Sequence, residues 1–135
     1  MINQTFINLP VTDLGGSITF FTSLGFKFNP KFTDENATCM ILNDNSFVML
    51  LTRNFFEKFT KKAVADAAQT TEVLVALMME SRKKVDELVN SALKAGGSSY
   101  SDPIDMGYMY QRSFADLDGH QWEIGFMDES KFPEK

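Results

Sequence analysis

The sequence predicts an α+β fold in which two βαβββ modules form a curled mixed sheet around a cleft. Three observations lead to this fold class. The order strand, helix and three strands can be read twice along the 135 residues, with the two helices beginning about 70 residues apart. Glycine directly follows each helix, at Gly25 and at Gly96-Gly97, which is typical of a helix end. An Asp118-Gly119 turn precedes the last strand, and this pair is a strong hairpin signal between apolar runs.

The first module begins with a strand at residues 4–10 and a helix at about 13–24. Thr12 or Asp13 can cap this helix, because either side chain can accept a hydrogen bond from a free N–H group of the first turn. The helix ends at Gly25. Three strands follow at residues 26–32, 37–42 and 46–52, and they complete a first module over residues 4–52.

Residues 53–70 separate the two modules. Their composition is typical of a helix, and Phe55, Phe56 and Phe59 fall along one side of it. We therefore predict a short helical linker that lays its phenylalanine rings on the sheet.

The second module repeats the pattern over residues 71–127. A strand rich in valine and leucine at 72–79 precedes a helix at 82–95, for which Ser81 is a good N-terminal cap. Three strands follow at residues 99–105, 108–117 and 121–127. The two modules and the linker are expected to form one domain over residues 1–135.

Composition and charge limit the possible partners. The chain is 44% hydrophobic and 23% charged, as in an ordinary globular protein. Its net charge of -5 argues against nucleic acid as a partner, because phosphate binding needs a basic surface. The single cysteine, Cys39, lies in an apolar run and is expected to be a buried thiol. No stretch has the pattern of a secretory signal or the apolar length of a membrane span, so we expect a cytoplasmic protein without a membrane partner.

The closing strand contains the most informative residue of the chain. Trp122, Ile124 and Phe126 fall on one face of this strand, whereas Gln121, Glu123 and Gly125 fall on the other. A carboxylate in so apolar a strand needs an explanation, because the burial of an unpaired charge is costly. Glu123 either lies on a solvated face or lines a cavity, and in the second case it is a candidate catalytic group.

Two motifs resemble those of a known family. Val11-Thr-Asp-Leu with Ser17-Ile-Thr-Phe-Phe-Thr-Ser-Leu-Gly-Phe26 resembles the opening helix of the vicinal oxygen chelate superfamily. Ser113-Phe-Ala-Asp-Leu-Asp-Gly-His-Gln-Trp-Glu123 resembles its closing turn and strand. That superfamily includes glyoxalase I, bleomycin-resistance proteins, fosfomycin-resistance enzymes and extradiol dioxygenases. The resemblance implies a stand-alone, bacterial, glyoxalase-like member, and it specifies a fold more than a reaction.

The resemblance also implies a divalent metal in the cleft, held by side chains from four strands. By motif, the four ligand positions fall on Phe6, about Leu50, about Leu74 and Glu123. Only Glu123 carries donor atoms, since phenylalanine and leucine cannot ligate a metal. The only histidine, His120, stands beside the turn and is expected to be an exposed residue without a catalytic role. We therefore expect neither a metal nor another cofactor.

A mainly apolar cleft with a few polar groups suits a small organic ligand. The residues expected to line it share faces of the matched strands and of a neighbouring strand: Phe6, Asn8, Leu50, Leu74, Met78, Tyr108, Tyr110, Arg112 and Glu123. Arg112 is the expected partner of Glu123, because a guanidinium can hold a carboxylate with two hydrogen bonds. The alternative is that large side chains fill the cleft and leave no ligand site.

Two classes of function remain open. The first is a binding protein without a catalytic metal that sequesters or senses an aromatic or cationic small molecule, as bleomycin-resistance relatives do. The second is an enzyme, either a lyase of the lactoylglutathione lyase type or a dioxygenase-related protein, with Glu123 as its proton-transfer group. The missing metal donors favour binding. Members of the superfamily usually dimerise, and the open edges of the predicted sheet make a homodimer reasonable.

Overall fold

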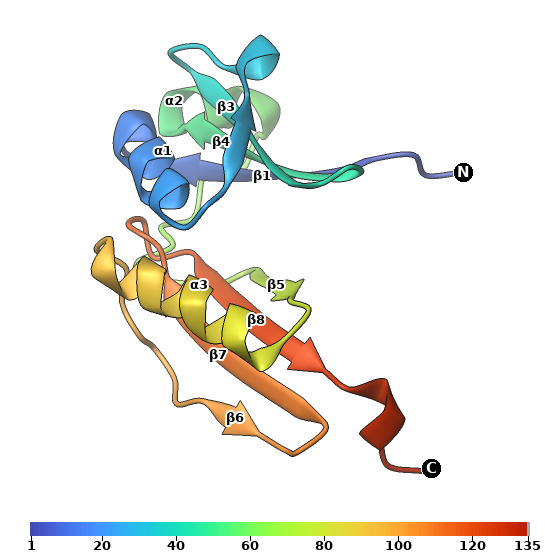
Figure 1. The fold of residues 1–135 in the computed structure, drawn as a ribbon. Helices are drawn as coiled ribbons and strands as arrows, with labels where there is room; N and C mark the ends of the chain where they lie inside the picture. The colour runs from blue at the N-terminus through green and yellow to red at the C-terminus, as the bar shows by residue number, and fades with distance from the viewer. Residues whose placement is uncertain (135) are drawn as a thin grey trace. The chain divides into compact units, whose positions relative to one another are not determined.

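The computed structural model describes residues 1–134 and contains two compact units, Met1–Asp66 and a second that begins at Ala67 (Figure 1). Each unit is described by itself. The elements of the first unit follow the order βαβββ, and those of the second unit repeat it. The predicted α+β class is therefore confirmed, and the strands form two separate four-stranded mixed sheets, one in each unit.

The first sheet has the strand order β1-β4-β3-β2. Its elements are β1 (Thr5–Val11), α1 (Leu14–Ser23), β2 (Lys27–Asn29), β3 (Ala37–Asn43) and β4 (Ser46–Thr52). β1 runs parallel to β4, whereas the other neighbouring strands are antiparallel. Asp13 provides the cap of α1, because its side chain accepts a hydrogen bond from the Gly16 N–H at 3.0 Å. The expected third strand at 26–32 is shorter, since Pro30 begins a 3-10 turn, η1 (Pro30–Phe32).

The two faces of the first sheet differ in what covers them. Val48 and Leu50 of β4 are fully buried in the core to which Phe20 and Phe21 of α1 contribute. The alternate residues of β4 point to the other face, on which Asn8 of β1 is exposed. This second face carries α2 (Arg53–Phe56), which packs against β1 and β4 and is followed by η2 (Glu57–Phe59).

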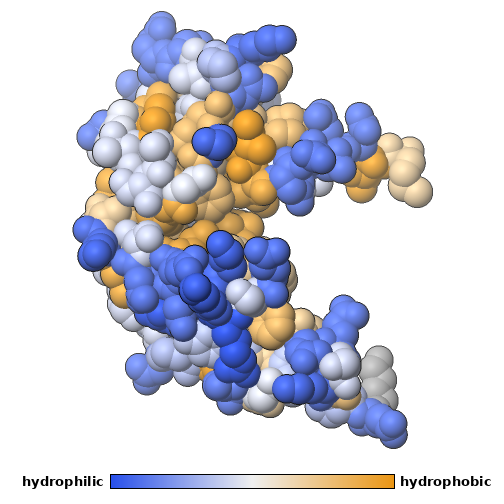
Figure 2. Space-filling model, viewed as in Figure 1, coloured by the Kyte–Doolittle hydropathy of each residue, from blue (hydrophilic) through white to orange (hydrophobic). Residues whose placement is uncertain are grey.

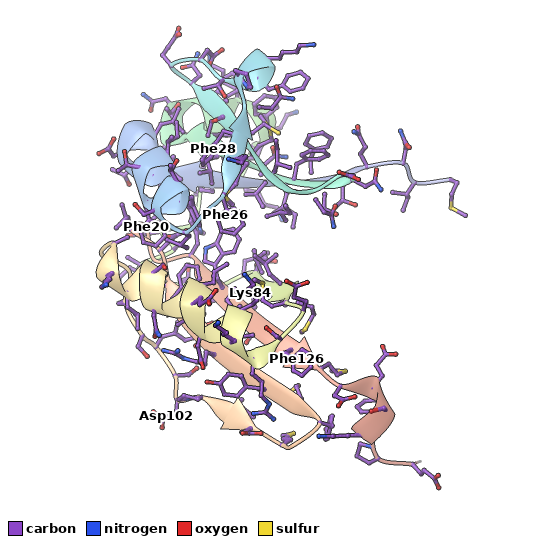
Figure 3. All side chains as sticks on the ribbon, viewed as in Figure 1. Phe20, Phe26, Phe28, Lys84, Asp102 and Phe126 are labelled. Carbon is purple, nitrogen blue, oxygen red and sulfur yellow. The ribbon has the colours of Figure 1, made fainter. Side chains whose placement is uncertain are left out.

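The second sheet has the strand order β5-β8-β7-β6. Its elements are β5 (Leu74–Met78), α3 (Arg82–Lys94), β6 (Ile104–Asp105), β7 (Met109–Ala115) and β8 (Gln121–Met127), followed by η3 (Glu129–Lys131). β5 is parallel to β8, and β7 is antiparallel to β8. α3 packs on β7 and β8, where Phe114 and Trp122 stack with ring centroids 6.2 Å apart. The side of α3 that faces away from the sheet is hydrophilic and carries Lys84 (Figure 2, Figure 3).

Two predicted elements are much shorter than expected. The linker is helical only in α2 and η2, and residues 60–73 contain no helix. No apolar stripe continues beyond Phe59, so nothing stabilises a longer helix by packing. The strand predicted at 99–105 is reduced to β6, because Pro103 cannot donate a ladder hydrogen bond. None of the helices in the described part of the chain combines the length and apolar character of a membrane span.

Candidate functional site

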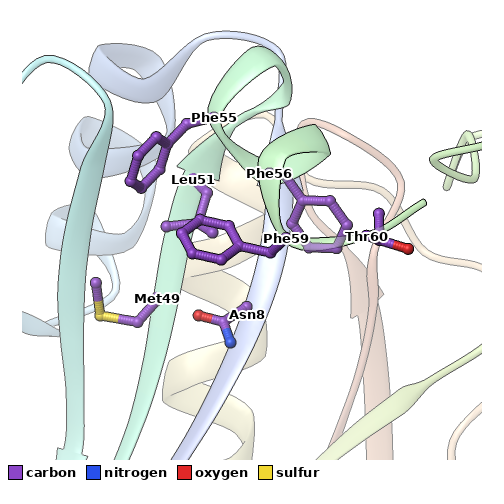
Figure 4. Close-up of a pocket in the computed structure, with 7 residues that line it drawn as sticks. All are labelled: Asn8, Met49, Leu51, Phe55, Phe56, Phe59 and Thr60. Atoms are coloured by element: carbon purple, nitrogen blue, oxygen red, sulfur yellow. The ribbon is translucent and has the colours of Figure 1, made fainter. Parts of the chain in front are cut away.

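A cavity of about 450 Å³ lies on the face of the first sheet that carries α2 (Figure 4). Its volume falls within the range of about 300–1,000 Å³ that is typical of small-molecule sites. The residues that line it come from two strands, two short helices and the residue after them: Asn8, Met49, Leu51, Phe55, Phe56, Phe59 and Thr60. All seven belong to the first unit.

The strands form the floor of this cavity. Asn8 of β1 is paired in register with Met49 of β4, so their side chains emerge side by side on the same face. Leu51 emerges on that face two residues further along β4. The floor therefore consists of one amide group from β1 beside two apolar side chains from β4.

The rings of Phe55, Phe56 and Phe59 form the wall (Figure 4). Phe55 and Phe59 meet edge to face, with centroids 5.1 Å apart and planes at 85°. The Thr52 side chain caps α2 by accepting a hydrogen bond from the Phe55 N–H at 3.3 Å, which starts the helix at the end of β4. The linker phenylalanines were predicted to lie on the sheet, and the structure places them on the sheet of the first unit.

The chemistry of the cavity is that of an apolar recess with two polar groups. The Asn8 amide can both donate and accept a hydrogen bond, and so can the Thr60 hydroxyl. None of the seven lining residues carries a charge. Aromatic walls bind flat rings through stacked or edge-to-face contacts, so the recess suits a planar apolar group with one or two polar substituents.

Of the residues predicted for the first module, Asn8 lines the cavity, whereas Leu50 does not. Leu50 is fully buried on the opposite face of the sheet, and Met49 and Leu51 occupy the positions expected for it. The prediction was wrong by one residue because β4 is apolar on both faces, so its sequence does not show which face is which. Phe6 shares the face of Asn8, is 44% exposed, and stacks on Phe47 at 4.8 Å.

In the second unit, Leu74, Met78 and Glu123 share one face of the sheet. Glu123 is paired in register with Ala76 of β5, and Leu74 and Met78 flank that alanine on the same side of the strand. Leu74 and Met78 are 49% and 58% exposed, whereas Glu123 is half-buried. The structure therefore brings together three of the predicted residues on an open, mostly apolar face.

Arg112 and Tyr110 lie on the opposite face of that sheet, so the expected pair of Arg112 with Glu123 is wrong. Register pairs Arg112 with Ile124, which faces α3. The Arg112 guanidinium donates to Asp86 and to Asn90 of α3, each at 3.0 Å. The Tyr110 hydroxyl also donates to Asp86, at 2.6 Å, and this bond and the Arg112 charge lower the pKa of Asp86. Tyr108 lies away from Glu123, with its ring against that of Phe132 at 4.9 Å.

Glu123 has polar neighbours that were not predicted. Ser113 of β7 is its partner in register, and the Ser113 hydroxyl lies 2.8 Å from that of Ser101. The Tyr100 hydroxyl is buried nearby, and no hydrogen bond of good geometry reaches it from residues 1–134. Burial raises the pKa of Tyr100, Ser113 opposes this effect, and the Glu123 charge adds to it. Tyr100 stands in a loop with no periodic pattern, so the sequence contains no signal for this position.

The turn before β8 is organised by Asp116, which is buried. Its carboxylate accepts hydrogen bonds from the Asp118 N–H, the His120 N–H and the Trp122 indole N–H, each at 3.0 Å. Burial raises the pKa of Asp116, and His120 and the Trp122 N–H oppose this shift. His120 is half-buried, not fully exposed as predicted. The geometry gives this turn a structural role, because it satisfies buried donors at the start of β8.

Comparison with known proteins shows a match to a family model over part of the chain and a shared fold over most of it. The model of a family described as "Bleomycin resistance protein-like N-terminal" matches residues 4–43. A hypothetical protein from S. aureus has a TM-score of 0.79 at 28% identity, covering 93% of this chain and 94% of that chain. A glyoxalase/bleomycin resistance protein/dioxygenase from Nocardioides has a TM-score of 0.72 at 22% identity, over 100% and 88% of the two chains. No protein with a curated description matches the sequence.

The chain has the fold of the solved glyoxalase/bleomycin resistance/dioxygenase proteins, and its first 43 residues include a match to a bleomycin-resistance-like family. A further solved structure, a glyoxalase/bleomycin resistance protein/dioxygenase family enzyme from Burkholderia phytofirmans PsJN, has a TM-score of 0.74 at 17% identity, covering 90% of this chain and 96% of that chain. At such low sequence identities the similarity shows that the fold is shared. It does not show which reaction or ligand the chain has, so its chemistry must be inferred from its own residues.

The metal that the resemblance to the vicinal oxygen chelate superfamily implies is not matched by the side chains of this chain. Within residues 1–134, no three His, Cys, Asp or Glu side chains gather where they could hold a metal ion. Glu123 is flanked by Ala76, Leu74 and Met78, and the floor of the first sheet carries Asn8, Met49 and Leu51. A divalent cation requires several nitrogen, oxygen or thiolate ligands, and this donor set does not fit one.

Proposed function

We propose that the protein binds a small organic molecule with a planar aromatic group in the cavity of the first unit. The observation that carries this proposal is the wall of three phenylalanines over a floor of Met49 and Leu51. Such a recess removes apolar ligand surface from water, at about 25 cal/mol for each Å². The Asn8 amide and the Thr60 hydroxyl then orient the polar substituents of the ligand.

The family comparison supports a protein that binds a small molecule and does not need to catalyse a reaction on it. The matched family is described by resistance to bleomycin, and its match over residues 4–43 includes Asn8 of the cavity floor. Apolar walls with neutral polar groups supply affinity and orientation but no Lewis acid or charged proton acceptor. Sequestration of an aromatic compound is therefore the function that these residues support best.

Phe59→Ala is expected to weaken the binding of 8-anilinonaphthalene-1-sulfonate about tenfold, because it removes one aromatic wall worth about 1–2 kcal/mol. The measurement is a fluorescence titration of the folded protein, with the melting temperature recorded for each variant. Phe32→Ala is the matched control, since Phe32 is 57% exposed on η1 and does not line the cavity. Equal weakening in both variants, or none in Phe59→Ala, would count against the proposal.

An enzyme that uses Glu123 is the second candidate. The observation in its favour is the buried Tyr100 hydroxyl, which lacks a partner among the described residues and lies within the field of the Glu123 carboxylate. A tyrosine hydroxyl close enough to feel a glutamate charge can act with it as proton donor and acceptor for a bound substrate. This candidate includes the glyoxalase-like lyase and dioxygenase-related activities of the superfamily.

Metal content separates binding from a metal-dependent form of the second candidate. Protein purified without chelator is expected to contain well under one equivalent of zinc, nickel, iron or manganese by elemental analysis, because no three His, Cys, Asp or Glu side chains gather around a metal position within residues 1–134. Glu123→Gln should leave that content unchanged. A stoichiometric metal that is lost in Glu123→Gln would favour the enzyme.

A further inference from the structure

The wall of the cavity is built on very little helix. α2 has four residues and η2 has three, and neither contains a buried residue. Helices shorter than about 12 residues are marginal in water, since their first turn fixes several dihedral angles for one hydrogen bond. The three phenylalanine rings are therefore held in place by contacts outside these two turns.

Arg53, the first residue of α2, makes such contacts. Its Nη2 group donates a hydrogen bond to the Val64 carbonyl at 2.9 Å and a longer one to the Ala65 carbonyl at 3.4 Å. These carbonyls lie 11 and 12 residues further along the chain, beyond all of the wall residues. The Arg53 side chain thus joins the two ends of residues 53–65 and closes them into a compact loop, in the manner of an Ω-loop.

This arrangement suits arginine in particular. A charged donor forms stronger hydrogen bonds than a neutral one, and the planar guanidinium can reach two successive carbonyls. A lysine ammonium also has several N–H donors, but it is a strongly hydrated charge on a flexible stem and would hold these two carbonyls less rigidly. Phe55, Phe56, Phe59 and Thr60 all lie within the loop that Arg53 closes.

We propose that Arg53 is a positioning residue for the ligand, which sets the affinity of the cavity by holding residues 53–65 as a closed wall. The proposal rests on the binding function proposed above. The hydrogen bonds from Arg53 to the Val64 and Ala65 carbonyls are called the clamp. When the clamp is removed, the wall is closed for a smaller fraction of the time, and the apparent dissociation constant of the ligand rises in inverse proportion to that fraction. The clamp touches the cavity only through the loop, so its effect on affinity exceeds its effect on global stability.

The experiment compares Arg53→Met, Arg53→Lys and Arg82→Met in the full chain. Titration with 8-anilinonaphthalene-1-sulfonate should show binding about tenfold weaker in Arg53→Met, which keeps the apolar stem, and an intermediate loss in Arg53→Lys. Amide hydrogen exchange should become faster at residues 57–66 in Arg53→Met, while the core strands β3 and β4 stay protected. Arg82→Met is the control, because the Arg82 guanidinium donates to Asp105 and to the Gly107 carbonyl in the second unit.

Unchanged probe affinity in a folded Arg53→Met protein overturns the proposal, and so does unchanged exchange at residues 57–66. If Arg53→Met fails to fold, Arg53→Lys provides the same two readouts. If Phe59→Ala does not affect the probe, the proposed function fails and the ligand part of this inference fails with it. Amide exchange then still decides whether Arg53 clamps the loop, so the two failures are distinguishable.

Discussion

Gly119→Ala is expected to lower the free energy of unfolding by about 3 kcal/mol, through two separate effects. Gly119 has a φ of +93°, a conformation that an L-residue with a Cβ adopts only at a cost of about 1–2 kcal/mol. An added Cβ would also lie 2.8 Å from the Ala67 carbonyl oxygen and 2.9 Å from the Ala68 Cα atom. Because both neighbours belong to the backbone, the chain itself must shift to relieve the overlap.

Gly107→Ala separates the two effects. Gly107 lies in the same unit with a φ of +80°, but a Cβ there meets nothing within 4 Å. Urea unfolding of both variants should therefore show a loss of about 1–2 kcal/mol for Gly107→Ala and a larger one for Gly119→Ala. Equal losses would mean that the segment at Ala67 moves away without cost.

Asp116→Ala is expected to destabilise the protein by about 3 kcal/mol, because it leaves three N–H donors without their acceptor. One of them is the indole N–H of Trp122, a fully buried residue. Asp34→Ala is the matched control, since Asp34 accepts hydrogen bonds from the Asn36 and Ala37 N–H groups in an exposed turn. Water can replace the acceptor at Asp34, so its loss should cost only about 1 kcal/mol in urea unfolding. A similar small loss at Asp116 would contradict the structural role of its carboxylate.

The same carboxyl group gives a pH dependence with a definite sign. Burial raises the pKa of Asp116 above its ordinary value, so the native state holds this proton more tightly than the unfolded chain does. The contribution of Asp116 is therefore most favourable below the ordinary carboxyl pKa, and it decreases as pH rises through the raised native pKa. Asp116→Asn cannot titrate, so the stability difference between this variant and the unchanged protein should shift in favour of the variant across that range.

The order of elements could be predicted because the signals that encode it are local. The cap at Asp13, the helix end at Gly25 and the Asp118-Gly119 turn each act within a few residues, and the structure contains all three features. Apolar alternation located most of the strands for the same reason. The strand expected at 99–105 failed because Pro103 and its polar neighbours outweighed the general pattern.

The site could be predicted only in part. Which residues line it depends on the pairing register of the strands and on the path of the chain after β4, and neither is encoded locally in the sequence. Five consecutive apolar residues, Phe47 to Leu51, fill both faces of β4, so no pattern distinguishes Leu50 from Met49. Arg112 looked like a cleft residue because a charge seldom faces a core. α3 makes that position possible by placing Asp86 and Asn90 opposite it. The cavity itself depends on where the chain runs after Thr60, and there the Val64 carbonyl accepts a hydrogen bond from the Arg53 side chain.

The pairing of β1 with β4 and of β5 with β8 also has a consequence for how the protein is made on the ribosome. In each module the first strand emerges early and must wait for the last strand, its only neighbour in the sheet. Residues 1–52 contain a full set of partners for the first sheet, so it can close while the rest of the chain is still being translated. The second sheet cannot close until β8 (Gln121–Met127) has left the ribosome, about 45 residues after β5 (Leu74–Met78). Long-range strand pairing of this kind is slow to form. Until it forms, Leu74 and Met78 are exposed on an unpaired strand, and such strands promote aggregation of newly made chains.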